Sequence, residues 1–303
     1  MKKIKRLIRN PFRVFLPFLF KLTPYIKNDE LFLRLRYLFE TGSFLHLNPP
    51  NTFNEKIQWL KLYDRNPLYT TMVDKYKVKK YVSNLVGKEY VAKTYGVWDS
   101  PNEIDFSQLP DKFVLKTTHG GGNNGVYICL EKNSLEISKV KAIFEKAMTL
   151  NIYDTSKEWP YKNVKKRIFA EEYLEDDQTK ELRDYKFFCF NGKVKMLFVA
   201  TDRQKREEPF FNFFDRNYSE LELQQGHPRK SSPPEKPQRF EEMILLAEQL
   251  AQGIPHVRVD LYEVNGKIYF GEYTFYHFGG FVPFSPKKWD SVLGKHINLP
   301  INK

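Results

Sequence analysis

The chain changes from helix-forming to strand-forming patterns near residue 90, and this change limits the folds that it can adopt. Apolar residues recur at spacings of three and four over residues 29–40 and 54–63, which predicts two helices, and we expect a third over 71–85. Further helices are expected over 138–150 and 240–252, between runs of strands. Helices followed mainly by strands are typical of an α+β protein, so we expect that fold class with a helical region in front.

Short apolar runs separated by turn residues predict the strands of this fold. We expect strands over 90–92, 112–116, 126–130, 167–173, 185–190, 193–200, 256–264 and 267–276. Two pairs of these strands are separated only by Asn-Gly, at 191–192 and at 265–266, which is typical of two-residue hairpin turns.

Composition narrows the class of protein and of partner. The chain has 303 residues, 41% of them hydrophobic, which is enough for one large or two moderate cores. It contains no run of 18 apolar residues, which excludes an ordinary transmembrane helix. The net charge of +12 favours an anionic partner: a nucleotide, an acidic glycan, a nucleic acid or an anionic lipid. Cys129 and Cys189 lie in apolar runs and suit a reducing compartment, so we expect a cytoplasmic protein.

The first 27 residues carry eight Lys and Arg residues and no acid. An apolar stretch over 14–20 is interrupted by Pro17, and no small-residue cleavage site follows, which disfavours a secretory signal. The segment either contacts an anionic membrane surface, at the inner face of the membrane, or forms a solvated arm or a helix packed on its own domain.

A glycine-rich turn lies between two predicted strands, in FVLKTTHGGGNNGV at 113–126. Glycines allow backbone amides to approach phosphate oxygens, and Lys116 supplies a positive charge beside them. The turn lacks the Gly-Lys-Ser/Thr of a Walker motif and is followed by a strand, which also excludes a Rossmann fingerprint. The alternative is an ordinary hairpin loop.

A hairpin that carries acidic residues is predicted near the end of the sequence, in HVRVDLYEVNGKIYFGEYT at 256–274. The carboxylates of Asp260 and Glu272 are hard oxygen ligands that suit Mg²⁺ carried by a nucleotide. A strict Asn-Gly turn places Glu272 on the opposite face from Asp260, so the metal hypothesis requires a longer turn or a bulge in one strand. Otherwise these are ordinary carboxylates on a strand surface.

In combination, these segments resemble the ATP-grasp superfamily, and specifically its TupA-like branch. The resemblance covers about residues 50–290. It rests on DKYKVKKYV at 74–82, the glycine-rich turn, IFAEEYL at 168–174, RDYKFFCFNGK at 183–193 and RVDLYEVNGKIYFGEYTFYHFGG at 258–280. The resemblance implies an ATP-grasp fold, in which two α+β subdomains clamp ATP behind a shortened helical N-terminal region.

The resemblance also implies roles for individual residues. The nucleotide phosphates would contact Lys75 and Lys116 and the loop residues Gly120, Gly121, Gly122, Asn123 and Asn124. Adenine would be held by Glu171 or Glu172 with the backbone near Tyr173 and Leu174, and the ribose by Asp176 or Asp177. Asp260 and Glu272 would bind Mg²⁺, with Thr274 where members often carry Asn. Lys186 and Arg258 would face the γ-phosphate, and Arg203 is a looser catalytic candidate.

These implications lead to a predicted domain plan and activity. We expect a basic segment at 1–28, a helical region at 29–88 and two ATP-grasp subdomains at 89–175 and 176–303. The expected activity is a carboxylate–amine ligase that uses ATP and Mg²⁺ and joins an amino acid or amine to a carboxylated sugar in polysaccharide biosynthesis. A sugar kinase on the same fold and a glycosyltransferase are the alternatives, and no nucleic-acid partner is expected because no reader motif is present.

Overall fold

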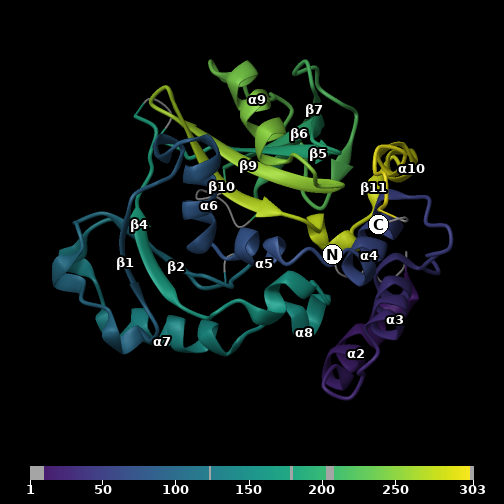
Figure 1. The fold of residues 1–303 in the computed structure, drawn as a ribbon, viewed down its shortest axis with the longest axis horizontal. Coiled ribbons are helices and arrows are strands. Elements are labelled where there is room, and N and C mark those ends of the chain that lie inside the picture. The colour runs from purple at the N-terminus through teal and green to yellow at the C-terminus, as the bar shows by residue number, and fades with distance from the viewer. Residues whose placement is uncertain (1–9, 123, 178–179, 203–207, 301–303) are drawn as a thin grey trace.

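Two antiparallel sheets flanked by helices form the protein (Figure 1). The computed structural model describes residues 10–122, 124–177, 180–202 and 208–300. The mixture of antiparallel sheet and helix confirms the predicted α+β class. Within these ranges, no helix combines the length and apolar character needed to cross a bilayer.

The smaller sheet has the strand order β1-β4-β2-β3. Its strands are β1 (Thr94–Trp98), β2 (Phe113–Thr117), β3 (Val126–Cys129) and β4 (Ile168–Glu172). Helix α7 (Ile137–Thr149) places Val140 and Phe144 against Phe113 and Leu115 of this sheet, and these side chains form a separate apolar core.

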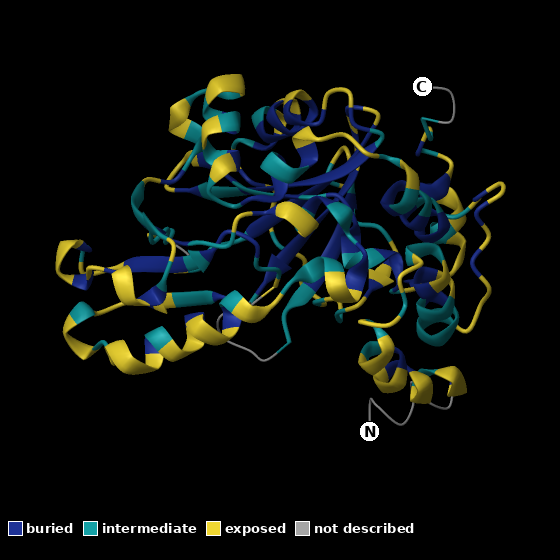
Figure 2. Ribbon diagram, turned by 60° about the horizontal axis from the view of Figure 1, so that its bottom comes forward, coloured by how far each residue is buried: buried dark blue, intermediate teal, exposed yellow. Residues whose placement is uncertain are grey.

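The larger sheet has the order β10-β9-β5-β6-β7 and forms the buried centre of the molecule (Figure 2). Its strands are β5 (Asp184–Phe190), β6 (Lys193–Thr201), β7 (Phe210–Asp215), β9 (His256–Val264) and β10 (Lys267–Thr274). Every residue of β5 is buried. Helix α9 (Phe240–Leu250) covers one face of this sheet. A two-stranded sheet of β8 (Gln224–Gln225) and β11 (Phe284–Ser285) lies next to strand β7.

The remaining helices are short, and several of them lie between or beside the two sheets. The α-helices are α2 (Leu16–Leu22), α3 (Asp29–Thr41), α4 (Phe53–Tyr63), α5 (Leu68–Val73), α6 (Lys77–Val86), α8 (Ile152–Ser156) and α10 (Lys288–Gly294). The 3-10 turns are η1 (Pro11–Phe15), η2 (Lys88–Tyr90), η3 (Pro101–Glu103), η4 (Phe106–Gln108), η5 (Lys132–Ser134), η6 (Trp159–Asn163) and η7 (His277–Gly280). Thr52 caps α4 through a capping box with Glu55.

The prediction of one helix over 71–85 is wrong, because the chain breaks between α5 and α6. The carboxylate of Asp74 accepts a hydrogen bond from the backbone N–H of Lys77 at 2.9 Å, so it replaces a helical partner at the start of α6. The backbone N–H of Lys75 donates instead to the carbonyl of Thr118 at 3.0 Å. The break thus joins this segment to the end of β2.

Two strand predictions also differ from the structure. The strand expected over 90–92 is wrong: β1 begins at Thr94, where its pairing with Glu171 of β4 starts. Strand β7 was not predicted, and it pairs with β6 at the edge of the larger sheet. Both differences arise because pairing with a distant strand, and not local propensity, decides where a strand lies.

Alternation along β5 and β9 sends side chains to two different environments. Lys186, Arg258 and Asp260 share one face of the larger sheet, and Lys186 lies directly opposite Asp260 across the ladder. The other face meets α9, where Cys189 Sγ lies 3.7 Å from the carbonyl of Ala247. Both Asn-Gly pairs form the predicted two-residue turns, with positive φ at each residue.

Candidate functional site

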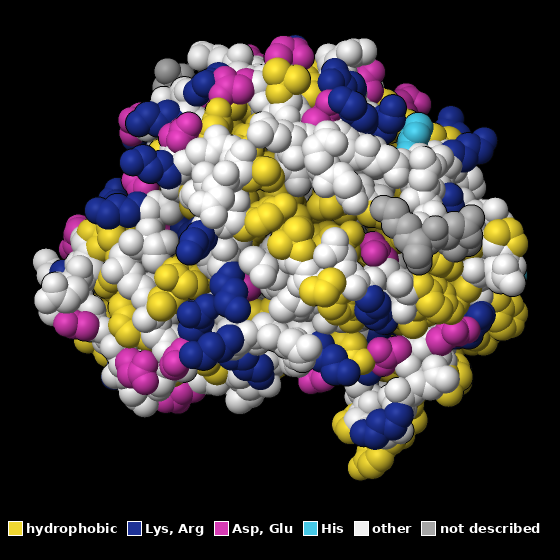
Figure 3. Space-filling view, in the orientation of Figure 1, with side chains coloured by type: hydrophobic (Ala, Val, Ile, Leu, Met, Phe, Trp, Pro, Cys, Tyr) yellow, Lys and Arg dark blue, Asp and Glu magenta, His cyan; other side chains and the backbone are white. Residues whose placement is uncertain are grey.

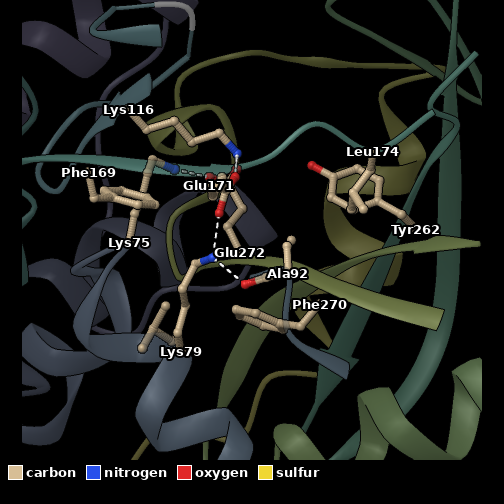
Figure 4. A pocket seen from close by; sticks show the side chains of 12 residues that line it. Lys75, Lys79, Ala92, Lys116, Phe169, Glu171, Leu174, Tyr262, Phe270 and Glu272 are labelled. Carbon is tan, nitrogen blue, oxygen red and sulfur yellow. Dashed lines mark hydrogen bonds and ion pairs between the residues drawn. The ribbon is translucent and has the colours of Figure 1, made fainter. Parts of the chain in front are cut away.

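A pocket opens between the two sheets and is bordered by α6 (Figure 4). Its lining residues are Lys75, Val78, Lys79, Ala92, Lys116, Phe169, Glu171, Leu174, Tyr262, Phe270, Gly271 and Glu272. Segments more than 190 residues apart in the sequence therefore meet at one place, as the contact between Lys75 and Glu272 shows.

On the smaller sheet, one carboxylate is shared by two lysines. Glu171 of β4 forms ion pairs with Lys116 of β2 and, at 2.6 Å, with Lys79 of α6 (Figure 4). Burial raises the pKa of Glu171, but the two ammonium groups outweigh it and lower the pKa to about 2. Glu171 therefore stays ionised at neutral pH and holds both lysines at the pocket wall.

A third lysine reaches across from the break between α5 and α6 to the larger sheet. The side chain of Lys75 forms an ion pair with Glu272 of β10. Burial alone would raise the pKa of Glu272, but the positive charges of Lys75, Lys186 and Arg258 lower it by more. The pKa of Glu272 is therefore well below its ordinary value. The pocket thus has a positively charged wall whose lysines are paired with carboxylates.

The deepest charged group is Asp260 of β9, whose side chain is fully buried. Arg258 donates to both of its oxygens, from Nε at 2.6 Å and from Nη2 at 2.7 Å. Lys186 pairs with it from β5 and also contacts Asp184 at 2.6 Å. Because buried charges are stable only when paired and hydrogen-bonded, these four side chains form one interdependent cluster.

Arg258 is fixed on its far side as well. Its Nη2 donates to Thr274 at 2.9 Å, and its Nη1 lies 2.7 Å from Nδ1 of His277. An arginine can only donate, so Nδ1 accepts and the proton of the neutral imidazole is on Nε2, which lies 3.0 Å from Gln225 Oε1. Burial and the neighbouring cations lower the pKa of His277, so its imidazole ring stays neutral.

A bulge in β10 decides which way Glu272 points. The turn is a strict two-residue turn, with Val264 opposite Lys267, but the register shifts at Gly271 so that Glu272 lies opposite Asp260. This is the bulge alternative that the metal hypothesis required. A Cβ on Gly271 would lie 2.9 Å from the ring of Tyr262 and 3.1 Å from the carbonyl of Asp260, so glycine suits this position.

The glycine-rich loop continues directly from Lys116 at the end of β2. Gly120 and Gly125 pack on the side chain of Thr117, where a Cβ on either would lie within 2.4 Å of its hydroxyl oxygen. Gly121 and Gly122 complete the described turn together with Asn124, whose N–H donates to Gly121 at 3.3 Å. Asn123 lies outside the described residues.

The pocket gathers some of the predicted nucleotide residues and not others. Lys75, Lys116, Glu171, Leu174 and Glu272 line it, and the loop lies beyond Lys116. Residues that do not line it are Glu172, which accepts from Lys93 N–H; Tyr173, which lies near Lys112; and Asp177, whose N–H donates to Asn265. Arg203 lies outside the described residues.

Sequence reasoning missed several side chains of the pocket. Lys79 belongs to the same DKYKVKKYV segment as Lys75, so its position one helical turn later was the available indication. Phe169, Tyr262 and Phe270 form an apolar wall with Ala92, whose carbonyl accepts from Lys79 at 2.8 Å. Nothing in their spacing distinguishes these aromatic residues from ordinary core residues.

The predicted metal ligands Asp260, Glu272 and Thr274 lie on the paired strands β9 and β10, but only Glu272 lines the pocket. Nη2 of Arg258 contacts Asp260 at 2.7 Å and Glu272 at 3.5 Å, so the two carboxylates are neighbours. Thr274 Oγ1 lies 3.4 Å from Glu272 Oε1. In the part of the chain that the structure describes, no three His, Cys, Asp or Glu residues form a cluster able to hold a metal alone. Both oxygens of Asp260 are hydrogen-bonded to Arg258, so a Mg²⁺ in the pocket would be bound by the carboxylate of Glu272 and would complete its shell with water and phosphate oxygens.

Comparison with protein families identifies the chain's relatives. Residues 55–298 match the family described as TupA-like ATPgrasp. The match covers most of the chain, including both sheets, and confirms the resemblance and the ATP-grasp fold expected from the motifs. A search of curated proteins finds no match to this sequence.

Solved structures with a similar fold are distant in sequence. A D-alanine–D-alanine ligase from Bacillus anthracis is 17% identical, with a TM-score of 0.41, over 75% of this chain and 60% of that chain. The ATP-grasp ligase PsnB complexed with a minimal precursor is 11% identical (TM-score 0.40; 73% and 59% covered). D-cycloserine synthetase DcsG is 15% identical (TM-score 0.40; 69% and 64% covered). The chain spans about 60% of the length of these proteins.

Proposed function

The chain belongs to the TupA-like ATP-grasp family, and on this basis we propose that it is an ATP-dependent ligase that joins a carboxylate to an amine through an acyl phosphate. The observation that carries the proposal is the convergence of Lys75, Lys116 and Glu272 on one pocket between the two sheets. A triphosphate needs several cations in separate positions, and Lys75, Lys79 and Lys116 reach the pocket from three segments: the break before α6, α6 itself and β2.

The pocket suggests how the nucleotide binds. The apolar wall of Phe169, Leu174, Tyr262 and Phe270 offers flat contact surface for a purine, and the backbone beyond Glu171 offers hydrogen-bonding groups. The glycine-rich loop after Lys116 offers backbone amides for phosphate oxygens. In this orientation the γ-phosphate lies toward Lys186 and Arg258, beyond Glu272.

The buried cluster supports the chemical step. Attack of a carboxylate on a phosphate brings two negative groups together, so cations must already be in position when charge develops. Arg258 and Lys186 are held in place by Asp260, and they would stabilise the pentavalent transition state without further rearrangement. Mg²⁺ would be held at the pocket by Glu272 with water and phosphate oxygens, and it would neutralise phosphate charge as a Lewis acid. Binding of the phosphates gives Lys75 a second partner beside Glu272.

We further propose the class of substrate from the family. The carboxylate is carried by a uronic acid or another acidic sugar, or by an amino acid, and the product is an amide in a polysaccharide such as capsule, O-antigen or cell-wall polymer. The two cysteines are free and buried, which suits a reducing, cytoplasmic location where ATP is available.

The direct test supplies MgATP, candidate uronic acids or amino acids, and hydroxylamine as a general amine. An acyl phosphate intermediate reacts with hydroxylamine to give a hydroxamate, which is detected by its ferric complex or by mass spectrometry. We expect hydroxamate to form only when ATP and the correct carboxylate are both present, and ADP to appear in equal amount.

Two alternative functions give different results in the same assay. A sugar kinase on this fold releases ADP without any amine and accumulates a phosphosugar, and that result contradicts the ligase proposal. A glycosyltransferase is stabilised in a thermal-shift screen by a sugar nucleotide in preference to ATP. Absence of ATP binding in calorimetry contradicts both ATP-dependent functions.

A further inference from the structure

Exposed apolar side chains gather on the first described segment, η1 and α2 with the turn that follows. These side chains are Phe12, Val14, Phe15, Phe18, Leu22 and Tyr25. Phe18 is 66% exposed and Tyr25 is 79% exposed. The helix lies at the edge of the molecule, away from both sheets (Figures 1 and 3). Clusters of large exposed apolar residues on a monomer mark an interaction surface.

Helix α2 has two apolar faces, and only one of them belongs to a core. Leu16 and Leu19 are buried, and Leu19 packs in a cluster with Phe32 of α3. Phe15, Phe18 and Leu22 follow one another at spacings of three and four and are about half exposed or more, although the ring of Phe15 also contacts Phe39 of α3. The outward face is therefore additional to what folding of α2 requires.

An ion pair and hydrogen bonds attach the start of this segment to α3. Arg13 forms an ion pair with Glu40 at 2.9 Å and donates to its carbonyl at 3.2 Å. Asn10 caps η1 through Phe12 N–H and donates to the carbonyl of Phe39 at 2.9 Å. These contacts fix the start of η1 on α3, so the outward face has a defined direction.

The charged residues of the first 27 positions have one sign in the sequence. Residues 1–27 contain eight Lys and Arg residues and no acid, and Lys21 and Lys27 are exposed beside the aromatic residues. The nearest acids in the sequence are paired: Glu30 with Arg34, at 2.8 Å, and Asp29 with Tyr153, at 2.7 Å. An aromatic face with a basic border is complementary to a bilayer that carries anionic headgroups.

We propose that the outer face of η1 and α2 docks in the interfacial region of an anionic membrane, with Phe15, Phe18, Leu22 and Tyr25 inserted among the headgroups. The uniform positive charge opposes pairing of this face with a second copy of the chain, because like charges would meet across a two-fold axis. The proposal does not rest on the ligase activity.

The test is co-sedimentation of the full chain with vesicles of phosphatidylcholine, made with and without phosphatidylglycerol. We expect binding only to the vesicles that contain phosphatidylglycerol, and we expect it to weaken as salt concentration rises. The double variant Phe15→Ser/Phe18→Ser should bind at least about tenfold more weakly, because it removes two inserted rings. Lys21→Glu should weaken binding by about fivefold or more.

A matched control is present on α9 at the opposite end of the molecule. Leu245 is 66% exposed, like Phe18, but helix α9 carries three glutamates and no Lys or Arg. Leu245→Ser should bind vesicles as the wild type does. Phe18→Ser, Lys21→Glu and Leu245→Ser should keep the wild-type melting temperature, and every variant should keep the wild-type ATP affinity. Equal loss of binding in the Leu245 and Phe15/Phe18 variants would overturn the proposal, as would no binding of the wild type. A wild-type dimer that Phe18→Ser converts to monomer, measured by light scattering, would assign the face to self-association instead.

Discussion

Each of the two sheets carries one acidic residue held by two cations, and the two clusters differ in how tightly they are enclosed. Glu171 on the smaller sheet is shared by Lys79 and Lys116, whose side chains are 13% and 27% exposed. Asp260 on the larger sheet is fully buried, and both of its oxygens are occupied by Arg258. The first cluster lines the pocket, whereas the second is built into the core.

This difference suggests a division of labour between the sheets. Lysines that are partly exposed can move from a carboxylate to an incoming phosphate with little reorganisation. A guanidinium fixed by Asp260, Thr274 and His277 cannot move, so it offers a preorganised charge to a transition state. We therefore expect the smaller sheet to govern nucleotide affinity and the larger sheet to govern turnover and stability.

The largest effect is expected for Asp260→Asn. The substitution leaves Arg258 and Lys186 buried without their negative partner, and breaking a buried ion pair in this way costs about 3–5 kcal/mol of unfolding free energy. Urea denaturation measures the loss. Asp99→Asn, which breaks an exposed pair with Lys165, is the control and should cost less than about 1 kcal/mol. Equal losses in the two variants would show that burial does not make the Asp260 pairs more important for stability than an exposed pair.

Lys186→Met should affect turnover more than substrate binding. Removing one preorganised cation is expected to raise the activation free energy by about 2–4 kcal/mol, seen as a lower kcat with a smaller change in KM for ATP. Lys195→Met, an exposed lysine on the neighbouring strand β6, should leave both parameters unchanged. If KM for ATP rises while kcat is retained, Lys186 contributes to nucleotide binding and the division between the sheets is wrong.

Glu171→Gln should reduce stability by about 1.5–3 kcal/mol at neutral pH, since it replaces charged hydrogen bonds by neutral ones. The pKa of this carboxyl is lowered to about 2 in the folded protein, from 4.5. The ion pairs therefore stabilise the protein above about pH 4.5, and this contribution is lost as the pH falls toward 2. The difference in unfolding free energy between wild type and variant should shrink over that range. A difference independent of pH would contradict the assigned pairing.

The smallest effect is expected for Gly271→Ala, which tests the bulge. The added methyl group approaches the ring of Tyr262 and the carbonyl of Asp260, and we expect a loss of about 1 kcal/mol in stability, with weaker ATP binding in calorimetry. The double variant Gly271→Ala/Tyr262→Ala removes the ring and should recover part of the added cost, as a double-mutant cycle can measure. No coupling between the two substitutions would mean that the bulge has room for a side chain.

The elements best predicted from sequence are those governed by local chemistry. The Asn-Gly turns at 191–192 and 265–266 have the positive φ angles that glycine and asparagine tolerate, and strand β9 has the predicted bounds. Failures occurred where a distant partner decided the structure. The break at Asp74 depends on Thr118 as well as on its own carboxylate, and β1 follows the register of β4.

The sequence by itself determined the chemical groups available at the site. These are the lysines, the carboxylates of Glu171, Asp260 and Glu272, and the glycines of one turn. Local sequence patterns are sufficient to predict the strands and the short turns, because the two-residue repeat of a strand and the geometry of a tight turn are properties of the backbone. Only the tertiary structure decided which charge meets which. The bulge at Gly271 turned Glu272 toward Asp260, and the break before α6 brought Lys75 across to it, because pairing of distant strands sets register and direction.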